Sequence, residues 1–401
     1  MLTQEEQERL TQTGAGTPMG NLLRRYWHAI AVASELDAEP VRPVRLLSES
    51  LVLFRTSTGQ LGLIGDRCLH RGISMAYGIP QSNGLRCAYH GWTYDSAGHV
   101  VDMPFEPMCI PFRTTAYPVQ ELGGVVFAYL GPEPVPLLPR WDMLVREDLN
   151  KTITPTLLPC NWLQCMDNSL DPAHFEHLHG VYGNYVMSKL GLPQMLNVAR
   201  HRKIDFEVFE YGVYKRRLLE GDPEDSPDWR VGHPILFPNI LAQGNDDRMS
   251  FQLRVPVDDT HTYNVIIDAV RPKPGESLRP PVVRDDPLTQ DAAGRIVATY
   301  INRQDEMAWV GQGAITDRTA EHLATSDKGI MLYRKLLLDN IARVERGEDP
   351  MGVVRDPAVN EPMIRIVRGS TYAAFKAGIE EDNWGGVDPL ALPAGAWVQP
   401  G

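Results

Sequence analysis

Two short segments, each pairing a cysteine with a histidine, constrain this chain more than any other feature of its sequence. The first reads C-L-H-R-G at residues 68–72, and the second reads C-A-Y-H-G-W at residues 87–92. One tight loop can present both side chains of each pair at a single point, and thiolates with imidazoles bind either zinc or an iron–sulfur cluster. Zinc ribbons usually repeat C-x-x-C, whereas one cysteine and one histidine per loop suit a two-iron, two-sulfur cluster with one thiolate-bound and one imidazole-bound iron. We therefore prefer the cluster, with zinc as the alternative.

The composition is that of a globular cytoplasmic chain. Hydrophobic residues make up 43% and charged residues 22%, and the formal net charge of −12 without a basic run argues against a nucleic-acid partner. No apolar stretch is long enough to cross a bilayer, and the first six residues are acidic where a signal peptide would be basic. Three further cysteines are expected to be buried free thiols in a reducing compartment: Cys109, Cys160 and Cys165.

A segment rich in Pro and Gly, G-P-E-P-V-P at residues 131–136, marks the clearest boundary in the sequence. Before it, a capping box formed by Thr3 and Glu6 predicts a helix to about residue 11. Short β-rich runs follow, at residues 44–47, 51–55, 61–65 and 125–130. We expect a first domain at residues 1–140 with the metal loops on a small all-β body, and a second domain at residues 141–401.

The second domain mixes structure types. Residues 204–208, 249–255 and 263–267 alternate polar and apolar side chains, which predicts an antiparallel sheet with one buried face. Residues 271–287 hold five prolines and predict a long loop. Helical spacing follows at residues 292–309 and 328–346. The fold class expected for this domain is α+β.

A second group of metal-ligand types lies between the two strand-rich regions. His174, His177 and His179 stand within six residues of one another, beside Asp167 and Asp171. Mononuclear non-haem iron typically uses two histidines and one carboxylate, with open positions opposite them. On a regular helix His174 and His177 share a face better than His174 and His179, so geometry alone leaves the pair undecided. Surface histidines on a helix are the simpler alternative.

The two Cys–His segments resemble the Rieske signature, and in particular that of the Rieske non-haem iron oxygenases. This resemblance implies a [2Fe-2S] cluster in which Cys68 and Cys87 bind one iron while His70 and His90 bind the other. It extends over nearly the whole chain and is closest to the phthalate-dioxygenase-like group, which includes the dehydrodivanillate O-demethylase oxygenases. The implied fold is an all-β Rieske domain followed by a catalytic domain with a central antiparallel sheet flanked by helices, of helix-grip type.

The same resemblance selects ligands for a mononuclear iron. The family motif D-x-x-H-x-x-x-x-H is matched by Asp171, His174 and His179, which implies that the two histidines bind the iron and that His177 is a neighbour. A π-bulge, or an early helix end near Gly180, would bring histidines five residues apart to one site.

The third iron ligand is implied by a Q-D-x-x-x-x-x-x-Q-G segment at residues 304–313, in which Asp305 is the ligand. Its rivals in the sequence are Glu306, Asp317 and Asp327.

Asp171 has a separate implied role. In related oxygenases the carboxylate at this position links a cluster-binding histidine of one subunit to an iron-binding histidine of the next, which here are His90 and His174. A homotrimer or a pair of trimers follows from that role. Asp171 also suits the N-cap of a helix with Pro172 in its first turn, and the two readings are compatible.

The implied function is that of a terminal oxygenase. It uses O₂ and electrons from an NAD(P)H-dependent flavin and iron–sulfur reductase, directly or through a ferredoxin, to O-demethylate a methoxylated aromatic compound or hydroxylate an aromatic ring. The alternatives are a cis-dihydroxylating aromatic-carboxylate dioxygenase and a Rieske protein that only transfers electrons. A substrate carboxylate would pair with an arginine. The candidates, each otherwise a surface or structural arginine, are Arg202, Arg217 and Arg230.

Overall fold

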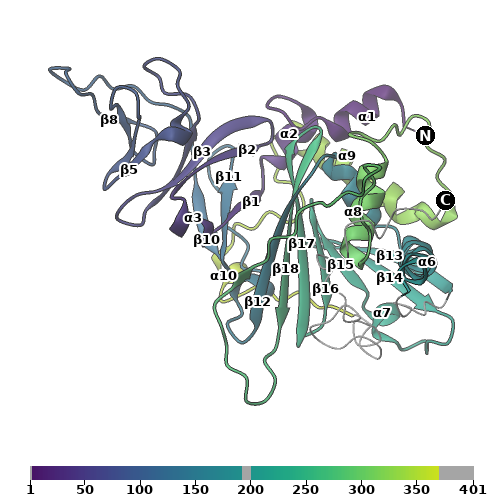
Figure 1. Cartoon of the computed structure of the whole chain (residues 1–401). Coiled ribbons are helices and arrows are strands. Elements are labelled where there is room, and N and C mark those ends of the chain that lie inside the picture. The colour runs from purple at the N-terminus through teal and green to yellow at the C-terminus, as the bar shows by residue number, and fades with distance from the viewer. Residues whose placement is uncertain (1, 192–199, 370–401) are drawn as a thin grey trace.

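The computed structural model describes residues 2–191 and 200–369, and it contains two parts of different build (Figure 1). A smaller β-rich part, formed by the chain from about residue 27 to residue 130, projects from a larger part that is built on one broad sheet with helices. This arrangement confirms the predicted α+β fold. Among the helices of the described residues, none combines the length and hydrophobicity that crossing a lipid bilayer requires.

The smaller part consists of short strands with two one-turn helices, α3 (Glu35–Ala38) and η1 (Met75–Tyr77). Its strands are β1 (Trp27–Val32), β2 (Val41–Leu46), β3 (Glu49–Arg55), β4 (Leu61–Gly65), β5 (Ile79–Gln81), β6 (Gly84–Arg86), β7 (Thr93–Tyr94), β8 (Val100–Asp102), β9 (Ala116–Tyr117), β10 (Val119–Leu122) and β11 (Val125–Tyr129). They form three antiparallel sheets, ordered β1-β11-β10, β2-β3-β4-β9 and β5-β6-β7-β8. The strands predicted at residues 44–47, 51–55, 61–65 and 125–130 are confirmed, with ends shifted by up to three residues.

The larger part is organised on an eight-stranded sheet with the order β13-β14-β15-β16-β17-β18-β12-β19. Its strands are β12 (Asn150–Leu158), β13 (His201–Phe209), β14 (Gly212–Leu219), β15 (His233–Leu236), β16 (Ile240–Gly244), β17 (Arg248–Asp258), β18 (His261–Val270) and β19 (Val282–Val283). Neighbouring strands are antiparallel except for the two-residue β19, which pairs in parallel with β12. The predicted loop at residues 271–287 is a loop apart from β19.

The remaining helices belong to the larger part, and some of them carry the candidate site residues. They are α1 (Gln4–Thr11), α2 (Pro18–Leu23), α4 (Asp142–Val145), α5 (Trp162–Ser169), η2 (Phe175–Tyr182), α6 (Gly183–Lys189), α7 (Pro227–Arg230), α8 (Ile301–Gly311), η3 (Thr325–Asp327), α9 (Lys328–Glu345) and α10 (Pro357–Asn360). Helix α5 packs on β17 and also contacts α8 and α9. The N-terminal helices α1 and α2 contact α9, from the far end of the chain.

Two predicted helices have different outcomes. The helix predicted at residues 328–346 is α9, and its predicted apolar face is buried. The helix predicted at residues 292–309 begins only at Ile301, so that prediction is wrong for its first nine residues. There the carboxylate of Asp291 accepts hydrogen bonds from the amides of Ala293 and Arg295, and Gly294 has a φ of +76°. This turn competes with helix formation.

Outcomes also differ among the predicted thiols. Cys160 and Cys165 are buried and free, as expected, with their sulfur atoms 3.9 Å apart. Cys109 is exposed, so the expectation of a buried thiol is wrong there. It lies in the connection between β8 and β9, where its thiol donates to the Val100 carbonyl at 3.1 Å but no core covers it.

An ion-pair network fixes α5, which leads directly into the histidine segment. The Asp167 carboxylate accepts from Arg318 at 2.9 Å and from Arg334 of α9 at 2.7 Å. Both guanidinium groups are buried. Because a buried charge is costly when its partner is lost, Asp167 holds α5 against α9.

We expect Asp167→Ala to lower the free energy of unfolding by about 3–5 kcal/mol, since the buried Arg318 loses its carboxylate partner and Arg334 keeps only its pair with Glu321. The measurement is the denaturant midpoint followed by circular dichroism. Asp339→Ala is the matched control, because it breaks only the exposed pair with Lys335 on α9 and should cost less than about 1 kcal/mol. Equal losses in the two variants would contradict the role given to Asp167.

Candidate metal centres

The two Cys–His segments fold into matching tight loops. In each loop the amide of the final glycine donates to the cysteine carbonyl, from Gly72 to Cys68 at 2.8 Å and from Gly91 to Cys87 at 3.1 Å. Both glycines have a positive φ, +73° and +80° respectively. Residues with a Cβ atom rarely adopt this conformation, so the glycines determine how each loop presents its cysteine and histidine.

The thiols of these loops face the interior and the imidazoles face outward. Cys68 and Cys87 are each 3% exposed, whereas His70 is exposed and its ring centroid lies 4.5 Å from that of His90. Trp92 stacks on His70 at 4.8 Å. Burial raises the pKa of Cys87, and the neighbouring Cys68 thiol raises it further. Two thiols beside two imidazoles are the donor set of a [2Fe-2S] cluster with one thiolate-bound and one imidazole-bound iron, so these residues fit that group.

The helix η2 solves the spacing problem posed by His174 and His179. It is a π-helix, in which hydrogen bonds join residues five apart, and His174 is its N-cap. A side chain and the one five residues later therefore share a face, and the two ring centroids are 5.1 Å apart. The predicted departure from regular helix near Gly180 is confirmed in its π form.

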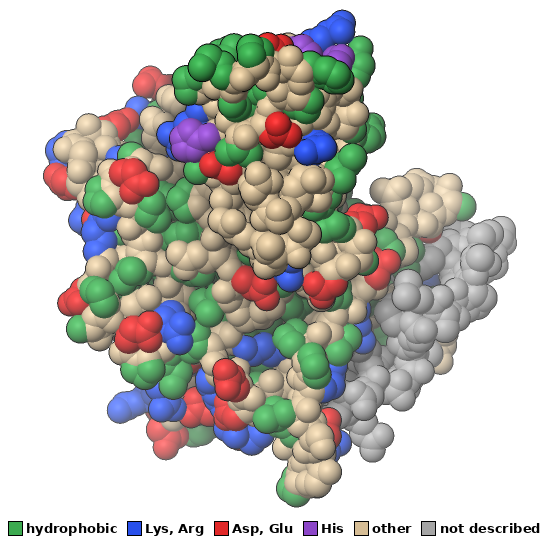
Figure 2. All heavy atoms as spheres, turned by 90° about the vertical axis from the view of Figure 1, so that its left-hand side faces the viewer, with side chains coloured by type: hydrophobic (Ala, Val, Ile, Leu, Met, Phe, Trp, Pro, Cys, Tyr) green, Lys and Arg blue, Asp and Glu red, His purple; other side chains and the backbone are tan. Residues whose placement is uncertain are grey.

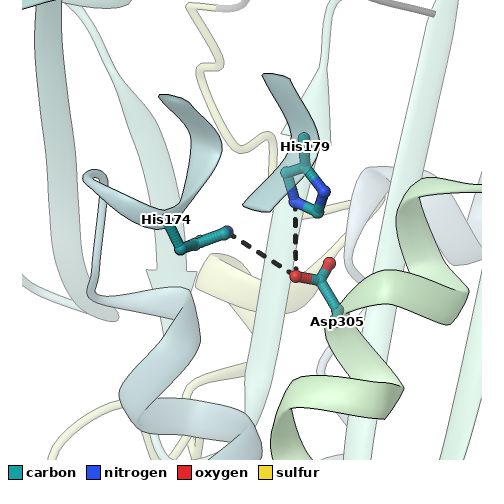
Figure 3. A group of neighbouring side chains, drawn as sticks. All are labelled: His174, His179 and Asp305. Carbon is teal, nitrogen blue, oxygen red and sulfur yellow. Dashed lines mark ion pairs between the residues drawn. The ribbon is translucent and has the colours of Figure 1, made fainter. Parts of the chain in front are cut away.

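Asp305 reaches the two histidines from α8 (Figure 3). Its Oδ1 lies 3.6 Å from Nε2 of His174 and 3.3 Å from Nε2 of His179. One ligand atom from each of the three residues lies within 4.8 Å of the others. The side-chain amide of Asn168, at the end of α5, donates from Nδ2 to the same Oδ1 at 3.3 Å. Two imidazoles and one carboxylate around one point are the donors that mononuclear non-haem iron uses.

The outer nitrogen of each histidine faces a second polar group. The Nδ1–H of His179 donates to Oε1 of Gln304 at 2.9 Å. Nδ1 of His174 lies 3.5 Å from Oδ2 of Asp171, whose Oδ1 accepts from the Ala173 amide at 2.7 Å. Such partners set the tautomer that leaves Nε2 free for a metal. The three residues therefore fit a mononuclear iron.

Burial and charge act together on the protonation of this group. Burial lowers the pKa of His174. Burial would also lower the pKa of His179, but the charge of Asp305 raises it. The two histidines in turn lower the pKa of Asp305 in spite of its burial, so the carboxylate is ionised at neutral pH.

The rivals named from the sequence lie elsewhere. Glu306 pairs with the buried Arg303, Asp317 caps a turn at Thr319, and Asp327 accepts from the Ala324 amide. The His177 side chain is 74% exposed. The structure does not bring these four side chains to His174 and His179.

Sequence reasoning missed three residues around the centres. The hydroxyl of Tyr94 lies 3.3 Å from the Cys68 sulfur and accepts from the Leu69 amide at 2.9 Å. Gln304 was part of a motif but had no assigned role. Lys215 lines a cavity beside His174, His179 and Asp305, together with Arg217, one of the three arginines considered above. The signal available in the sequence was the spacing of this pair, because side chains two residues apart in a strand point to the same face of the sheet.

The two groups of candidate ligands lie on opposite sides of the molecule. The second Cys–His loop connects β6 to β7, and its sheet, β5–β8, lies at the far left of Figure 1. Helices α8 and α6, which lie beside the histidine segment, are at the right. Figure 2 views the molecule from the side of the smaller part. Near the top of this view, hydrophobic side chains lie next to histidines. Three hydrophobic side chains are exposed around the two loops. Leu69 and Tyr89 belong to the loops, and Phe112 stacks on Trp92.

Comparisons with known proteins agree with this organisation. Residues 26–118 match the family described as Rieske [2Fe-2S] domain, and residues 292–373 match the family described as LigXa C-terminal domain like. The 5,5'-dehydrodivanillate O-demethylase oxygenase subunit of Sphingobium sp. (strain NBRC 103272 / SYK-6) is 39% identical over 397 residues, which cover 94% of this chain and 91% of that protein.

Two dioxygenase subunits are also similar to the chain. The phenoxybenzoate dioxygenase subunit alpha of Ectopseudomonas oleovorans is 35% identical, covering 90% of this chain and 91% of that protein. The phthalate 4,5-dioxygenase oxygenase subunit of Pseudomonas putida is 30% identical, covering 88% and 89%. Among solved structures, Pseudomonas putida CBB5 NdmA matches with a TM-score of 0.62 at 18% identity, over 82% of this chain and 94% of that chain. At that identity the likeness concerns the fold alone.

We expect Asp305→Ala to retain the two irons of the cluster and to lose the mononuclear iron. Removing a ligand should lower iron affinity by more than about 100-fold, the upper effect of removing an outer partner. Iron per chain and the visible absorption of the cluster are the two measurements. Asp317→Ala, which removes an exposed rival carboxylate, should retain all three irons. Retention of the third iron by Asp305→Ala would contradict the assignment.

Proposed function

The chain belongs to the Rieske non-haem iron oxygenases, which are oxidoreductases that use O₂, and on this premise we propose that it is the terminal oxygenase component of a system oxidising an aromatic compound. The favoured reaction is O-demethylation of a methoxylated aromatic or hydroxylation of an aromatic ring. The observation that carries it is the 39% identity, along 94% of the chain, to an O-demethylase oxygenase subunit. Cis-dihydroxylation of an aromatic carboxylate is the second candidate, because two relatives at 35% and 30% identity are dioxygenase subunits.

Enzymes of this family carry one Rieske [2Fe-2S] cluster and one mononuclear iron per chain. We assign the cluster to Cys68, Cys87, His70 and His90, and the mononuclear iron to the group defined above by His174, His179 and Asp305. When bound, the cluster supplies single electrons and the mononuclear iron supplies the position at which O₂ is activated.

The residues of the chain prepare that position. Oε1 of Gln304 accepts from the Nδ1–H of His179, which leaves Nε2 without a proton. Nε2 lies beside Asp305 and can bind a metal there. Asn168 donates to the Asp305 carboxylate and restrains its rotation. His179 is 2% and Asp305 is 8% exposed, which keeps bulk water from the reacting groups. These contacts orient the donors before a substrate arrives.

Electron supply favours an assembly of several subunits. Because the two centres of one chain lie at opposite ends, we propose a homotrimer, or a pair of trimers, in which the cluster loops of one subunit meet the histidine segment of the next (Figure 1). Asp171 would then link the partner subunit's His90 to His174. Its side chain is 23% exposed and lies 3.5 Å from His174, which suits that position. The exposed hydrophobic side chains around the cluster loops suit a covered interface.

The remaining assignments follow from the electron source. A flavin and iron–sulfur reductase, acting directly or through a ferredoxin, would reduce the cluster with electrons from NAD(P)H. We place the enzyme in the cytoplasm, where NAD(P)H is present. Residues 1–140 would form the electron-accepting unit with the N-terminal helices, and residues 141–401 the catalytic unit. Residues 370–401 of that unit lie outside the described part of the chain.

Product analysis tests the reaction. The purified enzyme is supplied with a reductase, NADH, ¹⁸O₂ and a panel of methoxylated aromatics and aromatic carboxylates. We expect loss of a methylene unit with release of formaldehyde from a methoxylated member. Two labelled oxygen atoms gained by one ring would instead establish the dioxygenase. Normal reduction of the cluster without oxidation of any panel member would contradict the proposed oxygenase.

Mixed assemblies test the route of electrons. His174→Ala leaves a chain with a cluster and no mononuclear iron, and His90→Ala leaves the reverse. Each variant alone should be inactive, whereas co-expressed chains should regain turnover because the cluster of one subunit serves the iron of another. Adding Asp171→Asn to the His90→Ala chain should reduce the regained turnover about 10–100-fold. No regained turnover in isolated mixed assemblies would show that electrons stay within one chain.

A further inference from the structure

Two buried thiols lie in contact with each other close to the cavity beside the three candidate iron ligands. The sulfur atoms of Cys160 and Cys165 are 3.9 Å apart, and both residues are 0% exposed. Cys160 precedes α5, and Cys165 lies within it, one helical turn before Ser169. Ser169 lines the cavity. The pair is therefore closed to bulk solvent but lies one turn from the space in which O₂ would react.

The position of the pair has a structural explanation, which its chemistry exceeds. Asn161 is the N-cap of α5, so Cys160 and Cys165 occupy the places of a hydrophobic staple, where two apolar side chains fix the start of a helix. Leu158 and Trp309 belong to the same buried cluster. Any apolar pair would serve as a staple. Two thiols in contact can also be oxidised to a disulfide, for which the sulfur atoms have to approach by about 2 Å.

A series of polar groups joins the cavity to Cys165. Gln252 lines the cavity, and its Oε1 accepts from the Arg254 guanidinium at 2.6 Å. Arg254 also donates to the hydroxyl of Ser169 and, at 3.0 Å, to the Cys165 carbonyl. Hydrogen peroxide is small and uncharged, and it forms the same kinds of hydrogen bond as water. These groups therefore offer it hydrogen bonds along the way from the cavity to Cys165.

The surroundings distinguish the two sulfur atoms. The contact with Cys165, together with burial, raises the pKa of Cys160, so this thiol keeps its proton. Cys165 lies next to Arg254, whose pKa is lowered by burial and raised by negative charge on Cys165. Reactive cysteines are found beside cations of this kind. The arrangement makes Cys165 the attacking sulfur and Cys160 the resolving one.

We propose that Cys165 and Cys160 reduce hydrogen peroxide that forms in the cavity when O₂ takes up two electrons and two protons without oxidising a substrate. The inference rests on the proposed oxygenase function as the source of this peroxide. It goes beyond that function by assigning a site of reversible oxidation to two residues that have no part in binding iron or substrate.

The reaction has two balanced steps. The Cys165 sulfur attacks one oxygen of the peroxide, the O–O bond breaks, and the other oxygen leaves with the thiol proton as water, which gives a sulfenic acid. The Cys160 sulfur then attacks the Cys165 sulfur, the S–O bond breaks, and hydroxide leaves with the Cys160 proton as a second water. Each sulfur is oxidised by one electron, and each peroxide oxygen is reduced by one.

Mapping of the thiols after uncoupled turnover tests the inference. The iron-loaded enzyme consumes O₂ with a reductase and NADH but without an aromatic substrate, in the presence of catalase, which destroys peroxide in bulk solution. Free thiols are alkylated under denaturing conditions, and the peptides are analysed by mass spectrometry. We expect a disulfide between Cys160 and Cys165, whereas the exposed Cys109 stays reduced. His174→Ala, which lacks the mononuclear iron, should keep both thiols of the pair reduced.

The peroxide released without catalase gives a second measurement. Because one dithiol reduces one peroxide, the peroxide recovered should fall short of the O₂ consumed by about one equivalent per chain. Cys165→Ala should abolish this shortfall, and Cys160→Ala takes its place if the first variant does not fold. Cys109→Ala is the matched control and should keep the shortfall.

Three results would overturn the inference. The first is a reduced pair after uncoupled consumption of O₂, and the second is oxidation of Cys109 ahead of the pair. The third is equal oxidation of the pair in His174→Ala. If no O₂ is consumed, hydrogen peroxide added to the resting enzyme decides, because it should form the same disulfide, and a pair that stays reduced would reject the role.

The thiol map also separates this inference from the oxygenase proposal. Oxidation of an aromatic compound by an enzyme whose pair stays reduced during uncoupled turnover would retain the oxygenase and reject the role of the two thiols. An iron-dependent disulfide in an enzyme that oxidises no aromatic compound would support the role of the thiols and reject the oxygenase.

Discussion

The contact of one buried carboxylate with two imidazoles is the interaction on which the catalytic part of this chain depends. His174 and His179 come from one helix, and they share a face only because that helix is wound as a π-helix. Asp305 comes from α8, more than a hundred residues later. The meeting of the three side chains therefore depends on where η2 and α8 lie, and the buried pairs of Asp167 hold the preceding helix α5 against α9.

Charge organises the space next to that contact. Buried arginines such as Arg303, Arg318 and Arg334 pair with carboxylates, so their positions are fixed before any ligand arrives. Within residues 2–191 and 200–369, Lys215 and Arg217 have no ion-pair partner, and both line the cavity beside His174, His179 and Asp305. The two Cys–His loops lie on the opposite side of the molecule from that cavity (Figure 1).

The sequence predicted local features well and distant ones poorly. The capping box of α1, the buried face of α9 and the strands of the smaller part follow from periodicities within a few residues. The match of Asp305 to the histidines required a family motif, because no local pattern distinguishes it from Glu306 next to it. The start of α8 was placed too early because the turn at Asp291 depends on side-chain hydrogen bonds. The missing partner of Lys215 is a tertiary property that no local pattern reveals.

The central claim is that one chain supplies two separate iron centres from the residues assigned here. Anomalous diffraction at the iron edge, from crystals of the iron-loaded enzyme, tests it most directly. The account predicts a pair of iron positions between the Cys68–Gly72 and Cys87–Gly91 loops and a single position among His174, His179 and Asp305. An iron signal confined to the loops, or a zinc signal in their place, would contradict it.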